Sequence, residues 1–316
     1  MDKNLETLVK MIGEYCESAG EKIKVFRDEP MSRHTSFKVG GTADLYLVPC
    51  DRDALIELCA MLRETGAQAY FLGNGSNVIF EDEGYRGAVV SMSELNKIEV
   101  CDNEIIAESG ATLASLSKTA RDCGLTGLEF SYGIPGSVGG AVTMNAGAYG
   151  GEISHVLKAS TYLDPVTMTV HTIYLEDHKY GYRESVYKNA GYVILSAVFE
   201  LKHGEKEEIA AQMNDYMQRR VSKQPLEYPS AGSVFKRYPG RFTGQMIEES
   251  GLKGYTIGGA QVSEKHAGFI INIGGATTKN IIDLIEYIKK VILEKFGCAL
   301  ECEVIVVRSW NRSQKK

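Results

Sequence analysis

A glycine-rich stretch from Ser131 to Gly151 constrains the fold of this 316-residue chain more than any other feature. Seven of its twenty-one residues are glycine, and four apolar residues are interleaved with them: Ile134, Val138, Val142 and Met144. Glycine allows the backbone to approach a ligand closely and to adopt positive φ, while the apolar residues would anchor that backbone to a core. The pattern predicts a wall of main-chain N–H groups against a large cofactor. The alternative is a compact turn between two strands, for which about two or three glycines suffice.

A shorter turn, Gly73-Asn74-Gly75-Ser76-Asn77, is predicted between strands at residues 69–72 and 78–80. It begins like the fingerprint of a dinucleotide-binding Rossmann fold, but the third glycine and the following helix are absent, so that fold is excluded. The remaining cluster of backbone N–H groups and short polar side chains suits a pyrophosphate. An Asn-Gly hairpin is the alternative interpretation of this turn.

Composition and charge limit the classes of function. The net charge of −6 gives no support for a nucleic-acid-binding face. No apolar run reaches the length of a membrane span, and the first twenty residues fit an amphipathic helix rather than a signal peptide. Seven scattered cysteines without a CxxC pair indicate a reducing cytoplasm. Six histidines without paired ligand spacing argue against a protein-bound metal.

Hydrophobic periodicity and capping residues predict a mixed α and β chain of two domains, with the boundary near His203 and Gly204. Helices are expected at residues 1–20, from a cap at Asp51 or Asp53 to Gly66, from a cap at Thr112 to Gly124, at 205–221, at 243–251 and from a cap at Thr278 to Gly297. Strands are expected at residues 43–49, 69–72, 78–80, 98–101, 105–107, 159–175, 192–201, 233–238, 267–273 and 300–307.

Two polar residues are candidates for proton chemistry. In the last predicted strand, Glu303 shares a face with Ile305 and Val307 by the two-residue period, so its carboxylate would be partly desolvated and could hold a proton. The alternative is an acid at a solvated strand end. Ser233 follows Ala231-Gly232, and its hydroxyl could project from a tight bend. Most such serines only bond to the local backbone, which is the alternative there.

Positively charged residues supply a second group of candidates. Arg183 lies among tyrosines, where a guanidinium can stack and bind an anion through two hydrogen bonds. The alternative is a surface arginine that pairs with Glu184. Lys223, Lys236 and Arg237 bracket Ser233 with positive charge in an acidic protein, which would suit a phosphorylated or carboxylated substrate.

With these features in place, the chain closely resembles the UDP-N-acetylenolpyruvoylglucosamine reductase family. The matching segments are residues 34–49, 72–80, 127–152, 180–188, 229–237, 251–272 and 300–304. The resemblance implies an α+β fold: a vanillyl-alcohol oxidase-like (PCMH-type) FAD-binding domain of two α+β subdomains, followed by a smaller α+β substrate-binding domain. The first domain would span residues 1–203, with a helix at 1–20 and a core at about 30–200, and the second residues 204–316.

The resemblance also implies the reaction. The family reduces the enolpyruvyl group of UDP-N-acetylglucosamine enolpyruvate to give UDP-N-acetylmuramate for peptidoglycan precursors, with non-covalent FAD as cofactor and NADPH as co-substrate. By the same resemblance Ser233 matches the proton donor, and Arg183 and Glu303 match residues that stabilise an enolate-like intermediate. A monomer in the cytoplasm is expected, which acts on a small sugar nucleotide and binds neither nucleic acid nor membrane.

The resemblance extends to the binding residues. Those that match FAD contacts are Gly73, Asn74, Gly75, Ser76, Asn77, Gly133, Ile134, Pro135, Gly136, Ser137, Gly139, Gly140, Asn145 and Ala146. Lys223 matches a lysine at the substrate diphosphate, and Arg237 a neighbouring contact, although Tyr238 stands where relatives have proline. The short 159–192 segment resembles the subgroup without an extra tyrosine-bearing loop. Two alternatives remain: a flavin oxidase with the same type of domain, and a non-catalytic regulator that binds a sugar nucleotide or a flavin.

Overall fold

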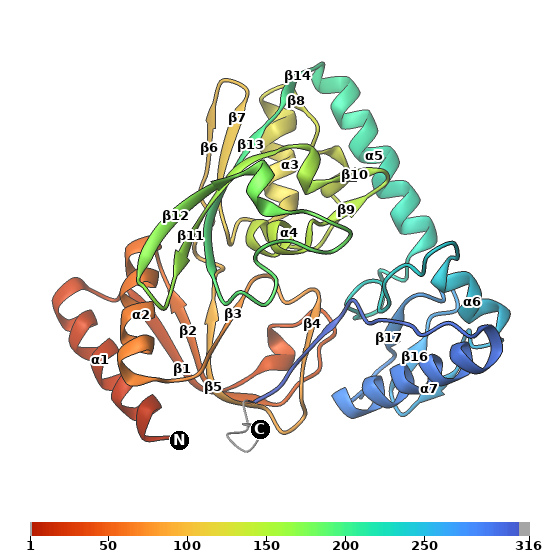
Figure 1. Ribbon diagram of the computed structural model, residues 1–316, viewed down its shortest axis with the longest axis horizontal. Helices are drawn as coiled ribbons and strands as arrows, with labels where there is room; N and C mark the ends of the chain where they lie inside the picture. The colour runs from red at the N-terminus through yellow and green to blue at the C-terminus, as the bar shows by residue number, and fades with distance from the viewer. Residues whose placement is uncertain (1, 310–316) are drawn as a thin grey trace. The chain divides into compact units, whose positions relative to one another are not determined.

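The computed structural model describes residues 2–309 of the chain (Figure 1). Within them, contacts between residues define two compact units, and each unit is assembled from several stretches of sequence. Unit 1 takes residues 2–27, 45–74 and 87–219, and unit 2 takes residues 28–44, 75–86 and 220–309. The division into functional domains at residues 203 and 204 stays a prediction.

One layered part of unit 1 packs two helices on a four-stranded sheet. The helices are α1 (Lys3–Ala19) and α2 (Arg52–Thr65), and the sheet order is β1 (Ile23–Pro30), β2 (Thr42–Pro49), β5 (Tyr85–Ser91) and β3 (Ala69–Leu72). The predicted apolar face of α1 is confirmed, because Leu5, Leu8 and Ile12 are buried with Leu55 and Leu58 of α2. The Asp51 side chain accepts a hydrogen bond from the Ala54 amide and caps α2, a contact worth about 1 kcal/mol.

The other part of unit 1 is a five-stranded antiparallel sheet covered by helices. The strand order is β12 (Thr169–Tyr174), β11 (Leu157–Asp164), β13 (Val193–Glu200), β7 (Glu104–Glu108) and β6 (Ile98–Cys101). Helices α3 (Leu113–Asp122) and α4 (Val138–Met144) lie on the same side of this sheet (Figure 1). Their apolar residues share one core with the strands: Leu113, Leu116, Val138 and Val142 pack with Ile105, Ala197 and Phe199.

Short elements complete unit 1. Strand β8 (Leu125–Thr126) pairs with β14 (Lys202–His203), and β9 (Gly147–Ala148) pairs with β10 (Gly151–Glu152). The single-turn 3₁₀ helices are η2 (Glu129–Ser131), η3 (Ile153–His155) and η4 (Leu175–His178). The long helix α5 (Lys206–Lys223) begins in unit 1, where Ile209 and Met213 are buried.

Unit 2 combines a three-stranded antiparallel sheet with two helices. The sheet order is β15 (Thr256–Ile257), β16 (Ala260–Val262) and β17 (Ile270–Asn272), and the helices are α6 (Thr243–Glu249) and α7 (Thr278–Phe296). Strand β4 (Val78–Phe80) pairs in parallel with β18 (Ile305–Val307), and η1 (Met31–Arg33) also belongs here. The core joins Phe37, Val39 and Ile79 from early stretches to Ile281 and Ile285 of α7.

Two predictions about local structure need correction, and one helix was not predicted. The glycine-rich stretch contains a helix, α4, because Ser137 caps it and Gly139 has room to approach Ser109 of the sheet layer. The cap of α7 is Thr277 rather than Thr278, and Thr277 forms a reciprocal capping box with Asn280. The last strand begins at Ile305, so Glu303 lies in a bend before it and does not share a strand face with Ile305 and Val307.

Two expected strands are also shorter than predicted. Residues 233–238 form only isolated bridges, and β17 covers three of the residues expected at 267–273. Glycines with positive φ flank both segments: Gly232 and Gly240 the first, and Gly274 the second. None of the helices within residues 2–309 has both the length and the apolar character that a membrane span needs.

Candidate active site

Two glycines allow close contacts in the turn at residues 73–77. At Gly75 φ is +61°, and a Cβ atom would stand 1.9 Å from the carbonyl oxygen of His34. At Gly73 a Cβ atom would stand 2.3 Å from Ser137 Oγ. A side chain at Gly75 would collide with backbone, and one at Gly73 would require the Ser137 hydroxyl to move.

Unit 1 brings the start of this turn against the glycine-rich stretch. Asn74 Nδ2 donates a hydrogen bond of 2.8 Å to the carbonyl oxygen of Pro135. Gly73 and Asn74 therefore lie beside residues 133–137, as expected if both segments bind one ligand. Gly75, Ser76 and Asn77 belong to unit 2.

The glycine-rich stretch is an irregular turn followed by α4. Ser137 accepts a hydrogen bond from the Gly140 amide, and Asn145 ends the helix with φ of +43°. The Gly139 amide donates to the carbonyl oxygen of Ser109 at 2.8 Å. Ser109 is almost fully buried, and its Oγ has no hydrogen-bond partner within the described residues. A buried hydroxyl without a partner is costly unless a ligand satisfies it.

A pocket of about 300 Å³ opens beside these segments in unit 1. Its lining residues are uncharged and mostly small: Gly73, Asn74, Ser93, Asn96, Gly110, Ala111, Thr112 and Ser115. The N-terminus of the ten-residue helix α3 faces this lining, where Thr112 Oγ1 accepts from the Ser115 amide at 3.0 Å. A helix N-terminus with neighbouring glycines favours an anionic phosphate group.

Sequence reasoning identified Gly73 and Asn74 but missed the other residues of this pocket. The signal was present: strand β7 leads through Gly110 to a threonine cap and a helix, which is a recurring arrangement for binding phosphate. Thr112 was predicted only as a cap. Ser93 and Asn96 lie in a loop with no distinguishing pattern.

Together these features fit a flavin adenine dinucleotide. At Gly73 the backbone can approach a ligand closely, and the pocket is lined by uncharged, mostly polar residues. The buried Ser109 hydroxyl has no hydrogen-bond partner within the described residues. These are the groups that a long, partly anionic and partly aromatic ligand requires.

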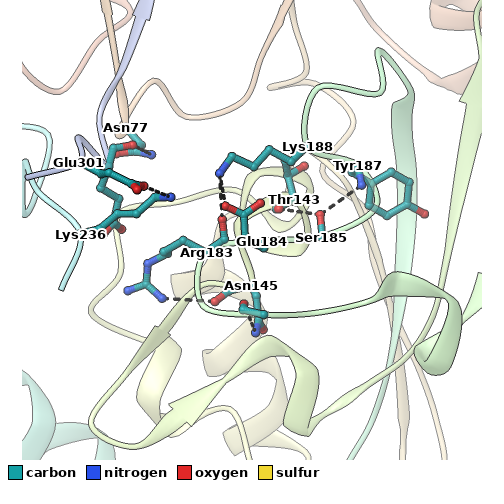
Figure 2. A network of polar contacts seen from close by, with 12 residues as sticks. Asn77, Thr143, Asn145, Arg183, Glu184, Ser185, Tyr187, Lys188, Lys236 and Glu301 are labelled. Atoms are coloured by element: carbon teal, nitrogen blue, oxygen red, sulfur yellow. Dashed lines mark hydrogen bonds and ion pairs between the residues drawn. The ribbon is translucent and has the colours of Figure 1, made fainter. Parts of the chain in front are cut away.

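Arg183 is held in unit 1 next to the end of the glycine-rich stretch. Figure 2 shows its guanidinium directed toward Asn145; the guanidinium donates to the carbonyl oxygens of Asn145 at 3.4 Å and Gly147 at 3.3 Å. The same guanidinium lies over the Tyr182 ring, 4.9 Å from its centroid. Both contacts orient the guanidinium beside the end of the glycine-rich stretch. Arg183 itself takes φ of +57°, which is unusual for a side-chain-bearing residue.

The alternative for Arg183 was an ion pair with Glu184. The Glu184 carboxylate accepts from Lys188 Nζ at 2.6 Å (Figure 2). A second carboxylate, Glu152, lies in the neighbourhood of Arg183: the Ser154 hydroxyl holds the pKa of Glu152 below its usual value, and Arg183 adds a smaller contribution.

Unit 2 brings Ser233, Glu303 and Asn77 together. Ser233 bridges to Phe269, while the Glu303 amide donates to the carbonyl oxygen of Val234, the residue after Ser233, at 2.7 Å. Asn77 Nδ2 donates to the Glu303 carbonyl oxygen at 3.1 Å. Asn77, predicted to bind the pyrophosphate, is thereby hydrogen-bonded to the segment that contains Glu303, the predicted acid. The Ser233 side chain is exposed, and Glu303 is half-buried.

The remaining predicted residues lie at the surface. Lys223 is the last residue of α5, and Arg237 is exposed before a tight turn that pairs Tyr238 with Arg241. Lys236 forms an ion pair of 3.0 Å with Glu301. Within residues 2–309, no three His, Cys, Asp or Glu side chains are grouped as metal ligands would be.

Sequence profiles of known families match both parts of the chain. The profile of an FAD binding domain matches residues 43–172, and the profile of the C-terminal domain of UDP-N-acetylenolpyruvoylglucosamine reductase matches residues 224–307. The first match shows that FAD is the cofactor. It also confirms the predicted PCMH-type fold class.

Individual proteins of the same name are similar to this chain over most of its length. A UDP-N-acetylenolpyruvoylglucosamine reductase of Caldanaerobacter subterraneus subsp. tengcongensis is 48% identical over 284 residues, 90% of this chain and 94% of that protein. One of Clostridium perfringens is 45% identical over 298 residues, 94% of this chain and 96% of that protein. The crystal structure of a UDP-N-acetylenolpyruvylglucosamine reductase from Thermus caldophilus matches with a TM-score of 0.76 and 33% identity, covering 90% of this chain and 99% of that one.

Proposed function

Because the chain belongs to the UDP-N-acetylenolpyruvoylglucosamine reductase family, we propose that it reduces the enolpyruvyl ether of UDP-N-acetylglucosamine to the lactyl ether, which is UDP-N-acetylmuramate. The observation that carries the proposal is 48% identity to one such reductase over 90% of this chain. NADPH is the proposed hydride source. The chemistry that bound FAD supplies is hydride transfer between the two substrates.

The residues that would hold FAD come from three segments. They are the turn at 73–77, the glycine-rich residues 133–140 with Asn145 and Ala146, and the uncharged pocket that contains Gly110, Thr112 and Ser115. Main-chain N–H groups and hydroxyls would meet the pyrophosphate, and the buried Ser109 hydroxyl would gain a partner. None of these contacts requires a covalent bond, so the flavin would be extractable.

Arg183 would stabilise the negative charge that develops during reduction. When hydride adds to the methylene carbon, electron density moves from the double bond toward the substrate carboxylate. A fixed cation beside that carboxylate lowers the energy of the transition state more than that of the ground state. The contacts from Arg183 to Asn145 and Gly147 support this role, since they orient the guanidinium beside the glycine-rich stretch.

Ser233 would donate the proton to the carbon next to the carboxylate. A hydroxyl is a weak acid in water, but a carbanion is a strong base, so a positioned serine suffices when water is excluded. The serine then recovers a proton from solvent, and the net reaction consumes one NADPH and one proton. Glu303, whose amide is bonded to the residue after Ser233, would orient this segment or polarise the substrate.

Substrate binding would use the second domain, which we place at residues 204–316. Lys223 would bind the diphosphate and Arg237 would contact a neighbouring part of the substrate, since both are exposed cations in an acidic protein. We propose that the enzyme is a cytoplasmic monomer.

The test measures coupling between the two substrates. Purified protein should be yellow and, without oxygen, should oxidise NADPH in proportion to the enolpyruvyl sugar nucleotide added, with one lactyl product formed per NADPH. Oxidation that requires oxygen would instead indicate an oxidase. A colourless protein that binds the sugar nucleotide without turnover would indicate a regulator, and either result would refute the proposal.

A further inference from the structure

A buried polar network lies behind the loop that carries Arg183. His178 ends η4 and is fully buried. Its Nε2 lies 2.7 Å from Ser160 Oγ on β11, and the same Oγ lies 2.6 Å from the Tyr187 hydroxyl. On the other side of the ring, Nδ1 lies 2.8 Å from the carbonyl oxygen of Tyr174. The network therefore joins β11 to both ends of the segment 174–187.

The partners fix the direction of every proton in this network. A carbonyl oxygen can only accept, so Nδ1 of His178 carries its proton and donates to Tyr174. Nε2 is then the acceptor of the neutral ring and receives the Ser160 hydroxyl proton. Ser160 Oγ in turn accepts from the Tyr187 hydroxyl. Each donor in the network has one acceptor, and the arrangement exists only while the imidazole is neutral.

The loop between His178 and Val186 has the conformation of a segment that needs external support. Lys179 and Arg183 take left-handed φ values of +49° and +57°. Such residues persist only where the surroundings determine the backbone. The His178 carbonyl oxygen closes the loop by accepting from the Val186 amide at 2.8 Å, and the Tyr180 ring stacks on the imidazole with centroids 5.1 Å apart.

The tip of the loop is attached to the glycine-rich stretch. Asn145 Nδ2 donates to the Gly181 carbonyl oxygen at 3.2 Å, and Ser185 Oγ donates to the Thr143 carbonyl oxygen at 2.7 Å (Figure 2). The loop is thus held at its tip by the flavin-binding segment and at its base by the buried network. A change at the base would move the guanidinium of Arg183 relative to the glycine-rich stretch.

We propose that His178 is a positioning residue for Arg183: its neutral ring, bonded through Ser160 and Tyr187 to the sheet, fixes the base of the loop that presents the guanidinium. The inference rests on the proposed catalytic function of Arg183. The rate of the reaction would then depend on His178, although this side chain does not contact the substrate.

The network also makes the loop sensitive to acid. A proton on Nε2 would turn the ring nitrogen into a donor toward Ser160 Oγ, so the Ser160 hydroxyl proton would lose its acceptor inside a buried site. Burial lowers the pKa of His178, while Asp177 and Glu176 on its own element oppose that effect more weakly. From the other elements, the His178 ring faces Ser160, Tyr180 and Tyr187. The two tyrosines are uncharged at neutral pH, because burial raises the pKa of Tyr187 to about 12 and also raises the pKa of Tyr180. The ordered loop is therefore expected to be lost as the pH falls.

The test uses His178→Ala and the permanently neutral His178→Gln in the holoenzyme, with exposed His203→Gln as the matched control. His178→Ala should lower kcat by roughly 10–100-fold, as expected for a displacement of about 1 Å, with little change in flavin content. In His178→Gln, part of the activity should persist at acid pH where the unmodified enzyme loses it. Amide exchange of residues 179–186 should be faster by about tenfold in His178→Ala and unchanged in His203→Gln.

A double variant separates this inference from the proposed function. If His178 acts through Arg183, His178→Ala should cost less than about threefold in an Arg183→Gln background, because the two effects are not additive. Multiplied losses, or unchanged exchange of residues 179–186, would overturn the inference. If Arg183→Gln alone leaves turnover intact, the proposed role of Arg183 fails, while the exchange data still decide whether His178 orders the loop. Tyr187→Phe gives the same exchange test should His178→Ala not fold.

Discussion

Replacement of Gly110 by alanine tests how the flavin site is built. Gly110 lines the pocket between β7 and α3, and a Cβ atom there would stand 1.7 Å from the backbone carbonyl oxygen of Met92. Cβ atoms essentially never approach another atom within 3.0 Å, so the turn or the Met92 segment must move by at least about 1.3 Å. Because the atoms that the Cβ would meet belong to the backbone of Met92 and Leu95, no flexible side chain can move aside. Overpacking of this kind costs about 1–3 kcal/mol.

That displacement should weaken FAD binding, since the moved turn forms part of the pocket wall. If the full cost opposes binding, FAD affinity falls by roughly 5–150-fold. The matched control is Gly13→Ala in α1, outside the proposed flavin site, where an added Cβ would meet nothing within 4 Å. FAD would be removed and titrated back with flavin fluorescence as the signal. Equal FAD affinity in the Gly110 and Gly13 variants would refute the steric argument.

Three further predictions concern single groups. Ser233→Ala should preserve NADPH-dependent flavin reduction but slow product formation by at least about 10²–10⁴-fold, measured by single-turnover absorbance; equal slowing of both half-reactions would remove Ser233 from the donor role. Tyr180→Phe removes a buried hydroxyl that has no partner within the described residues, so stability should stay equal or rise by about 1 kcal/mol in denaturant melts, whereas Tyr187→Phe should lose about 1 kcal/mol; a loss for Tyr180→Phe would indicate a hidden partner. Burial lowers the pKa of His178 and His266, so the unfolded chain binds protons more readily, and their contribution to stability, complete above about pH 6.5, should be lost as the pH falls below it; denaturant melts that show no decline toward about pH 5.5 would contradict this.

Local signals in the sequence predicted much of the fold. The strands at 69–72 and 78–80 and the helix capped by Asp51 formed where short apolar runs, caps and glycines indicated them. The fold class was confirmed as well. These features depend on neighbouring residues, which a sequence displays directly.

The predictions that failed depend on contacts between distant residues. Helix α4 contains Gly139 and Gly140, poor helix formers, and forms because Gly139 can approach Ser109 closely. The alternation of residue types placed Glu303 in the last strand. That strand begins only at Ile305, where pairing with β4 begins. The pocket residues Ser93 and Asn96 are brought beside Gly110 by tertiary structure alone.

The order in which the chain leaves the ribosome has a consequence for unit 2. Its core needs Phe37, Val39 and Ile79, made early, together with Ile281 and Ile285, made late. Strand β4 cannot form its parallel pair until β18, more than two hundred residues downstream, has been synthesised. Unit 1, by contrast, is complete once residue 219 has emerged. Phe37, Val39 and Ile79 therefore lack their C-terminal core partners through most of translation, and residues 204–316 made as a separate fragment would lack the strand beside which their last strand lies.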